Sequence, residues 1–327
     1  MDDIPAVWLD CDTGLDDALA LLYLTAAPCT LLGVSTVAGN CALERATANT
    51  LGVLEAAGAA EVPVHPGAAG PLVGQAEDAR HVHGDDGIGG CGGLLPAPSR
   101  GTSAPPAAAA MAAALRARPG AVTLVASGPL TNLALLVRAD PEAAGLARRV
   151  VVMGGTVLEP GNVAPTVEFN IGADPEAAGL VLGAGWPVTL VGLDVTRRVL
   201  ATADDAADLE RADTPPARLA AALISAYTQA YIRLGFPPAA PLHDPLAAAI
   251  ALDPGLAETA DVPVAIETQG TFTRGMVVAD LRVRTRPALL GDRRVVRVCL
   301  GVDAARARQE LLARWARRSG RPGAPQR

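Results

Sequence analysis

The sequence predicts a single α/β domain whose core is an open, mostly parallel sheet of the Rossmann type, flanked by helices. Short apolar runs rich in β-branched residues alternate along the chain with stretches rich in alanine and leucine. This alternation is typical of a parallel sheet that is buried on both faces. Half of the 327 residues are hydrophobic, so a sizeable core can be buried. In such folds the sites lie at the carboxyl ends of the strands, near the topological switch point.

The expected elements follow one another from the amino end. Strands are expected at residues 6–12, 31–37, 62–65, 122–126, 150–153 and 188–193. Helical stretches lie between most of them, at residues 16–25, 43–57, 105–117 and 175–182. The remainder is more mixed, with helices at 216–234, 245–252 and from Asp303, and shorter strands at 262–267, 276–278 and 295–300. We expect one domain over residues 1–313 and a frayed, arginine-rich end over residues 314–327.

The composition excludes several classes of partner. The chain has 34 acidic and 27 basic residues and a net charge of −7. Nucleic acids and anionic membranes need a basic footprint, so neither is expected as a partner. We find no signal-peptide pattern and no uninterrupted apolar run of about 18 residues, so a cytoplasmic protein without a membrane span is expected. The five cysteines are scattered without a CxxC pair and are expected to be reduced thiols.

Four aspartates stand close together after the first expected strand, in the stretch WLDCDTGLDDA at residues 8–18. Carboxylates packed so closely resist ionising together unless a positive charge joins them. Asp16 and Asp17 fall at a helix start, where negative charge is favourable, so capping is one explanation for them. Capping does not explain Asp10 and Asp12, which point to one side of a buried strand. The cluster therefore predicts a hard divalent cation, with capping and local salt bridges as the alternative.

The spacing Asp-x-Asp at the end of the first strand also resembles phosphatases of the haloacid-dehalogenase type. Those enzymes use the first aspartate as a nucleophile and rely on a lysine to hold the phosphoryl group. This chain contains no lysine, because all 27 basic residues are arginine. We therefore reject the phosphatase interpretation.

Seven short motifs follow one another along the chain. They are DCDTGLDD at 10–17, VAGN at 37–40, HGDDG at 83–87, VASGPLTN at 125–132, MGG at 153–155 with GN at 161–162, EFN at 168–170 with DPEAA at 174–178, and LHDP at 242–245. In order and spacing they resemble the inosine–uridine-preferring nucleoside hydrolase family. Several fall in two long Gly/Pro-rich loops, 66–103 and 154–170, and loops of that length tend to be functional or disordered. The resemblance implies an N-glycosyl hydrolase that splits ribonucleosides into ribose and free base.

The resemblance also implies a calcium ion held by four carboxylates and one backbone carbonyl. The carboxylates are those of Asp10, Asp12, Asp17 and Asp244, and the carbonyl is that of Ser127. Many family members have threonine at the last position, but serine should serve equally because the ligand is a backbone atom. Asp12 is the expected general base and takes a proton from a metal-bound water, which is more acidic than bulk water. The transition state resembles an oxocarbenium ion, as in glycoside hydrolysis.

The family's ribose ligands correspond here to Asp16, Asn40, Asn162, Glu168 and Asn170. A sugar that lacks a hydroxyl would leave such buried polar groups unpaired. We therefore expect a preference for ribonucleosides over deoxyribonucleosides.

Two of the four histidines are candidates for work on the leaving base. His243 precedes a metal ligand, and the ordinary pKa of histidine suits a general acid, although a histidine at a helix start is otherwise a structural residue. His83 is a second candidate, near the base or the 5′ side of the sugar. His65 and His81 have no motif context and are expected to be structural or exposed.

The base pocket is the least constrained part of the prediction. Tyr227, Tyr231 and Phe236 either pack in the core or flank the base, and Met153 either packs in the core or contacts the sugar face. None of the three tryptophans stands where a purine-stacking type would need one, which favours base-tolerant or pyrimidine-preferring relatives.

Two alternatives stay open. The first is a hydrolase of another N-ribosyl compound, such as nicotinamide riboside or a modified nucleoside. The second is a non-catalytic homologue that binds nucleosides or ribose, although such a protein would be expected to have lost a key residue, and Asp12, Asp17, Asp244 and His243 are all present. The family resemblance implies a homodimer or homotetramer.

Overall fold

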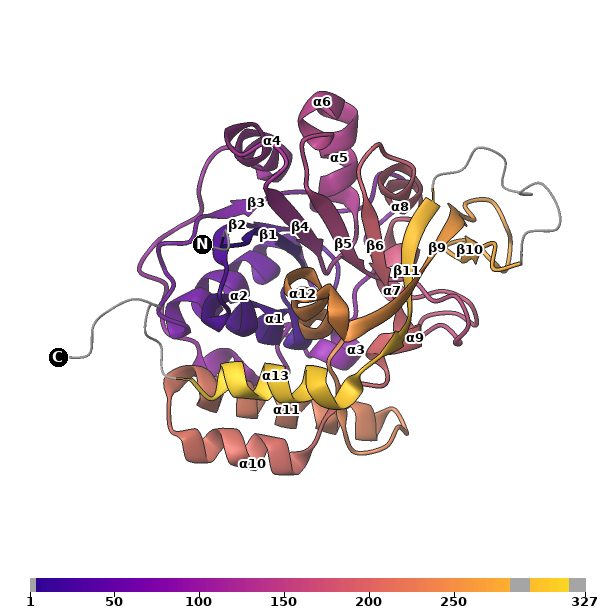
Figure 1. Ribbon diagram of the computed structural model, residues 1–327. Coiled ribbons are helices and arrows are strands. Elements are labelled where there is room, and N and C mark those ends of the chain that lie inside the picture. The colour runs from indigo at the N-terminus through magenta and orange to yellow at the C-terminus, as the bar shows by residue number, and fades with distance from the viewer. Residues whose placement is uncertain (1–3, 283–294, 318–327) are drawn as a thin grey trace.

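The computed structural model describes residues 4–282 and 295–317 and is built around one sheet (Figure 1). The strand order in this nine-stranded sheet is β10-β9-β11-β6-β5-β4-β1-β2-β3. Its strands are β1 (Ala6–Cys11), β2 (Thr30–Thr36), β3 (Val64–Pro66), β4 (Val122–Ala126), β5 (Arg149–Met153), β6 (Val188–Val191), β9 (Ala257–Ile266), β10 (Val277–Ala279) and β11 (Val295–Val302). A separate antiparallel pair joins β7 (Leu200–Ala201) to β8 (Ala240–Pro241).

Seven neighbouring strands of the sheet, β11-β6-β5-β4-β1-β2-β3, run parallel to one another. At the β11 edge, β9 and β10 add two antiparallel pairings. The chain builds outward from β1 to β2 and β3, and then returns to place β4 on the other side of β1. Such a reversal is a topological switch point, where a crevice opens at the carboxyl ends of the strands. The predicted fold class, a single domain with a mostly parallel sheet, is confirmed.

Helices connect the strands and cover the sheet. They are α1 (Leu15–Ala26), α2 (Leu43–Ala56), α3 (Arg80–His83), α4 (Ala107–Ala117), α5 (Thr131–Ala139), α6 (Pro141–Ala144), α7 (Phe169–Ala173), α8 (Pro175–Leu182), α9 (Leu193–Thr196), α10 (Ala203–Ala212), α11 (Pro215–Arg233), α12 (His243–Leu252) and α13 (Ala304–Trp315), with short 3₁₀ turns η1 (Cys91–Leu94) and η2 (Pro254–Leu256). Among the described helices, none combines the length and apolarity that a membrane span needs.

The two faces of the sheet are covered by different sets of helices (Figure 1). One face packs against α1, α2 and α12, with α11 and α13 farther out, and the other packs against α4, α5 and α8. Side chains alternate along a strand, so β1 sends Leu9 and Cys11 into the first core and Trp8 into the second. Cys11 therefore points away from Asp10.

The elements around the aspartates begin and end slightly differently from the prediction. β1 ends at Cys11, so Asp12 lies in the turn before α1 and not on the strand. α12 begins at His243, two residues before the predicted helix, which places both His243 and Asp244 in its first turn. The sequence prediction does not include α10, and it misses the β7–β8 pair because strands of two residues carry no periodic signal.

The final helix continues past residue 313, where the sequence places the end of the domain. α13 includes Arg314 and Trp315, and the Trp315 side chain is fully buried. Its Nε1 donates a hydrogen bond to the Leu19 carbonyl of α1 at 3.0 Å, so the helix is tied to the core up to its last residue. Residues 318–327 lie outside the described residues.

Candidate active site

A cavity of about 630 Å³ opens at the carboxyl ends of the parallel strands. Met153 ends β5, and Asn40 and Ser127 follow β2 and β4, so the central strands deliver three of its wall residues. Most of the predicted site residues line it, namely Asp16, Asn40, His83, Ser127, Met153, Asn162, Glu168, Asn170, Tyr231, His243 and Asp244. Asp10, Asp12 and Asp17 are buried beside it, and their hydrogen bonds connect them to the wall.

Asp10, near the end of β1, has one oxygen occupied and one free. Its Oδ1 accepts hydrogen bonds from the Ser35 hydroxyl on β2 and from Asn132 Nδ2 on α5, the latter at 2.8 Å. Its buried Oδ2 has no partner among the described residues. Burial raises the pKa of Asp10 to about 7, although both hydrogen bonds oppose this shift.

Asp12 likewise has one oxygen that is hydrogen-bonded and one that is not. Its Oδ2 accepts the backbone N–H of Asn40 at 2.6 Å, whereas its buried Oδ1 has no partner within the described part of the chain. The backbone passes close to the carboxylate at Gly39 and Gly128, where any Cβ would overlap the Asp12 side chain. Burial raises the pKa of Asp12, and repulsion by Asp17 adds to the shift.

The Asp17 carboxylate accepts hydrogen bonds from three donors, one of which is the Ser127 hydroxyl. Asp17 Oδ2 accepts from Gly14 N at 2.9 Å and from Asn40 Nδ2 at 3.0 Å, and its Oδ1 accepts from the Ser127 hydroxyl at 2.7 Å. The Ser127 carbonyl accepts from Asn170 Nδ2 at 2.9 Å. Ser127 thus contributes its side chain as well as the carbonyl that the resemblance implies.

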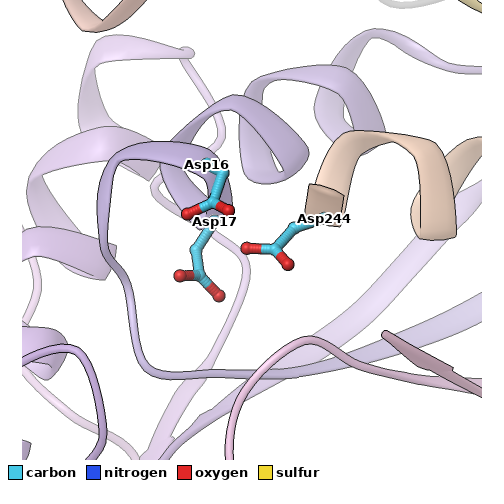
Figure 2. A group of neighbouring side chains, drawn as sticks. All are labelled: Asp16, Asp17 and Asp244. Atoms are coloured by element: carbon cyan, nitrogen blue, oxygen red, sulfur yellow. The ribbon is translucent and has the colours of Figure 1, made fainter. Parts of the chain in front are cut away.

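Figure 2 shows Asp16 and Asp17 on the first turn of α1 and Asp244 on the first turn of α12, with their carboxylates pointing toward one another. Each offers an oxygen within 4.8 Å of the other two. Asp16 Oδ2 accepts from the Tyr227 hydroxyl at 3.3 Å, and its buried Oδ1 has no partner among the residues described. The resemblance assigns Asp16 to the ribose and not to the metal. In the structure its carboxylate nevertheless lies next to those of Asp17 and Asp244.

The buried aspartates have no ion-pair partner among the described residues. No ion pair within residues 4–282 and 295–317 involves Asp10, Asp12, Asp16, Asp17 or Asp244. Burial, followed by repulsion from neighbouring aspartates, raises the pKa of Asp244 and also raises that of Asp16 to about 8. Orphaned oxygens on three of these side chains are donor atoms of the kind that a hard cation requires. The residues present therefore fit a divalent cation such as calcium.

Glu168, the N-cap residue of α7, lines the cavity and has its carboxylate bound by the backbone. It accepts from Gly155 N at 2.8 Å and from Asn170 N at 2.9 Å, and burial raises its pKa to about 7. Asn170 Nδ2 also donates to the Met153 carbonyl at 3.2 Å. Met153 is both buried in the core and part of the cavity lining, and its contact with a sugar stays a prediction.

His243 also lines the cavity and lies beside Tyr231, which packs against two further aromatic rings. The Tyr231 hydroxyl lies 3.2 Å from His243 Nε2, and His243 Nδ1 lies 2.7 Å from the Thr196 hydroxyl. The ring of Tyr231 contacts Tyr227 edge-on and Phe236 at a tilt, with centroids 5.1 and 5.2 Å apart. Burial lowers the pKa of His243 to about 3, so the ring is neutral at pH 7.

His83 has a defined tautomer. Its Nδ1 accepts the Leu15 backbone N–H at 3.0 Å, at the start of α1. The remaining proton of the neutral ring must therefore sit on Nε2. Burial lowers the pKa of His83 to about 3, so it is a neutral hydrogen-bond donor in the wall of the cavity.

The model of the inosine-uridine preferring nucleoside hydrolase family matches residues 7–309. The chain belongs to this family. It is 39% identical over 275 residues to the inosine-uridine preferring nucleoside hydrolase of Crithidia fasciculata, covering 84% of this chain and 87% of that protein.

Two further relatives agree with this assignment. The chain is 39% identical over 277 residues to the pyrimidine-specific ribonucleoside hydrolase RihA of Citrobacter koseri, covering 84% of this chain and 88% of that protein. The structure of the plant nucleoside hydrolase PpNRh1 superimposes with a TM-score of 0.90 at 31% identity, covering 96% of this chain and 99% of that one. The chain is therefore an enzyme of the N-glycosyl hydrolase class, as the sequence predicts.

Three residues in or beside the cavity of this nucleoside hydrolase are not site candidates in the sequence. His81 is exposed, as expected, but it also lines the cavity, and so does Arg197. Thr196 lies beside His243 and is fully buried. The family motifs contain none of these three residues. His81 lies two residues before the HGDDG motif in the loop that carries His83, and that position is the one signal that points to it.

Proposed function

We propose that this hydrolase cleaves the N-glycosidic bond of ribonucleosides, giving ribose and free base, with calcium in its aspartate cluster. One observation carries the proposal. Within the described part of the chain, buried carboxylates with unpartnered oxygens and no ion-pair partner stand beside a cavity that is lined by both hydrogen-bonding groups and aromatic rings. A nucleoside needs both kinds of surface, because its sugar carries several hydroxyls and its base is flat.

The proposed calcium ligands are the free Oδ2 of Asp10, the carboxylates of Asp12, Asp17 and Asp244, and the carbonyl of Ser127, with Asp12 binding through the oxygen that also accepts the Asn40 amide. When bound, calcium would offset the carboxylate repulsion, hold sugar hydroxyls and lower the pKa of a nearby water. The Ser127 hydroxyl and Asn40 hold Asp17 in place for this role.

Asp12 is the proposed general base. Its Oδ2 is committed to the Asn40 amide, so Oδ1 is the oxygen that takes the proton of the attacking water. The hydrogen bond and the close backbone at Gly39 fix the carboxylate in one orientation. A base held in this way loses little freedom when the reaction begins.

The leaving base would be served by the neutral His243–Tyr231 pair. With a pKa of about 3, His243 cannot be an imidazolium at pH 7, so this pair supplies a hydrogen bond or relays a proton. His83 Nε2–H is a second fixed donor. Base preference stays open, because the relatives include an inosine-uridine preferring and a pyrimidine-specific enzyme.

The proposal is tested by a panel of purine and pyrimidine nucleosides assayed for released sugar. We expect ribose release from ribonucleosides and at least about a hundredfold lower kcat/KM for the matched 2′-deoxynucleosides, since unpaired buried polar groups cost about 1–3 kcal/mol each. Equal rates on both series would contradict the proposed sugar site. Nicotinamide riboside in the same panel tests the alternative substrate class.

A further inference from the structure

Asp194 of α9 and Arg197, which directly follows that helix, bind the backbone of five consecutive residues, 157–161, the last two of which line the cavity. Asp194 Oδ2 accepts the N–H of Val157 at 3.0 Å, and Oδ1 accepts the N–H groups of Leu158 and Glu159 at 2.6 and 3.3 Å. Arg197, directly after α9, donates from Nη1 to the Pro160 carbonyl at 2.7 Å and from Nη2 to the Gly161 carbonyl at 3.0 Å. We call Asp194 and Arg197 the α9 clamp.

The clamped segment leads directly into Asn162, which is exposed and lines the cavity. Beyond the clamp the loop folds back on itself, because Gly161 N donates to Pro165 O and Asn162 N donates to Val167 O. Asn162 Oδ1 accepts the N–H of Phe169 at 2.9 Å, which directs its Nδ2 donor away from that bond. The position of Asn162 thus depends on how the segment before it is held.

Arg197 is the member of the clamp that also faces the cavity. Its two bonds are charge-assisted and need the planar fork of a guanidinium, which a lysine cannot reproduce. Asp194 is fully buried and its bonds saturate both oxygens, so it serves as the fixed anchor.

We propose that Arg197 is a positioning residue that, with Asp194, presents Asn162 to the sugar in a preformed wall. Its action is on substrate binding and passes through the backbone of Pro160 and Gly161. The kinetic part of this inference rests on the proposed function, whereas the structural part does not.

The test uses Arg197→Met, which removes both the charge and the bonds, and Arg197→Lys, which keeps the charge. The exposed neighbour Arg198→Met is the matched control. In hydrogen exchange of the free enzyme, both Arg197 variants should speed exchange at residues 161–163 by about tenfold, as expected when a locally held segment opens more often. Unchanged exchange in Arg197→Met, or wild-type exchange in Arg197→Lys, would overturn the clamp.

The kinetic readout separates positioning from chemistry. We expect KM for a ribonucleoside to rise about tenfold in both Arg197 variants, with kcat within about twofold, because the clamp supports uniform binding. In an Asn162→Ala background, Arg197→Met should add less than about twofold, because both act through one contact. Additive effects, or a fall in kcat at unchanged KM, would contradict the inference. If the wild type releases no ribose at all, the proposed function fails, and the exchange experiment still decides on the clamp.

Discussion

At the scale of single residues, the carboxylates of the site are distinguished by what remains free on each. Asp10 and Asp12 each have one oxygen bound by the protein and one buried without a partner. Nothing in the stretch WLDCDTGLDDA reveals this asymmetry, because the donors come from Ser35, Asn40 and Asn132, far away in the sequence. The residue types predict a cation, but only the fold shows which oxygens are available.

The first prediction concerns Asp12. Asp12→Asn keeps the shape and the Asn40 contact but cannot accept a proton from water, so kcat should fall by about 10²–10⁴-fold, the usual contribution of a general base. Steady-state ribose release checks this value, and circular dichroism checks that the fold is kept. Turnover within about fivefold of the wild type would refute the assignment.

The second prediction concerns His243. His243→Ala should reduce the rate with inosine far more than the rate with p-nitrophenyl riboside, whose leaving group needs no help. Tyr231→Phe should show a weaker form of the same pattern, because it removes the hydroxyl beside His243 Nε2. Equal losses on both substrates in His243→Ala would argue for a structural role.

At the scale of elements, helix starts and tight backbone turns bring the acids together. α1 and α12 both begin beside the cavity, and their first turns carry Asp16, Asp17 and Asp244 (Figure 2). Alternating apolar runs predict both helices and the parallel strand before α1, and hence the edge of the sheet where the site lies. The α9 clamp is not predictable in the same way, because four-residue helices and irregular loops leave no periodic pattern.

The third prediction concerns the turn at Gly39. A methyl group there would overlap Asp12 Oδ2 and lie 2.7 Å from Pro129 Cδ. Gly39→Ala should therefore lower the free energy of unfolding by about 1–3 kcal/mol and weaken calcium binding. Gly101→Ala, where a Cβ meets nothing within 4 Å, is the matched control and should leave both unchanged. Denaturant unfolding and calcium titration measure the two effects, and a Gly39→Ala protein with wild-type values would exclude this packing constraint.

At the scale of the whole molecule, the concentration of buried acid links stability to pH and calcium. Without calcium, burial raises the pKa of Asp10 to about 7 and of Asp16 to about 8, above their ordinary value of 3.8. A group whose pKa is raised by folding contributes stability below its unfolded pKa and loses it as pH rises through the folded pKa. The calcium-free protein should therefore lose stability between about pH 4 and pH 8.

The fourth prediction follows from this linkage. Calcium should raise Tm more at pH 8 than at pH 5, because the ion offsets charge that is present only at the higher pH. Thermal unfolding with calcium or with a chelator at both pH values measures the difference. A calcium effect that is equal at the two pH values would contradict the predicted titration of the aspartates.

For the whole molecule, the sequence predicts the family but not the oligomeric state. The motifs from Asp10 to Pro245 predict the family, and the family model and the fold agree with them. The oligomeric state does not follow from either, and the expected homodimer or homotetramer remains a prediction that light scattering can test.

The most direct test of the proposed site is ribose release from a ribonucleoside by enzyme stripped of calcium and then resupplied. With calcium removed by a chelator and dialysis, release should fall to background, and added calcium should restore it in parallel with the rise in Tm. Full activity in the stripped enzyme, with calcium shown to be absent, would contradict a cation at the centre of the aspartate cluster.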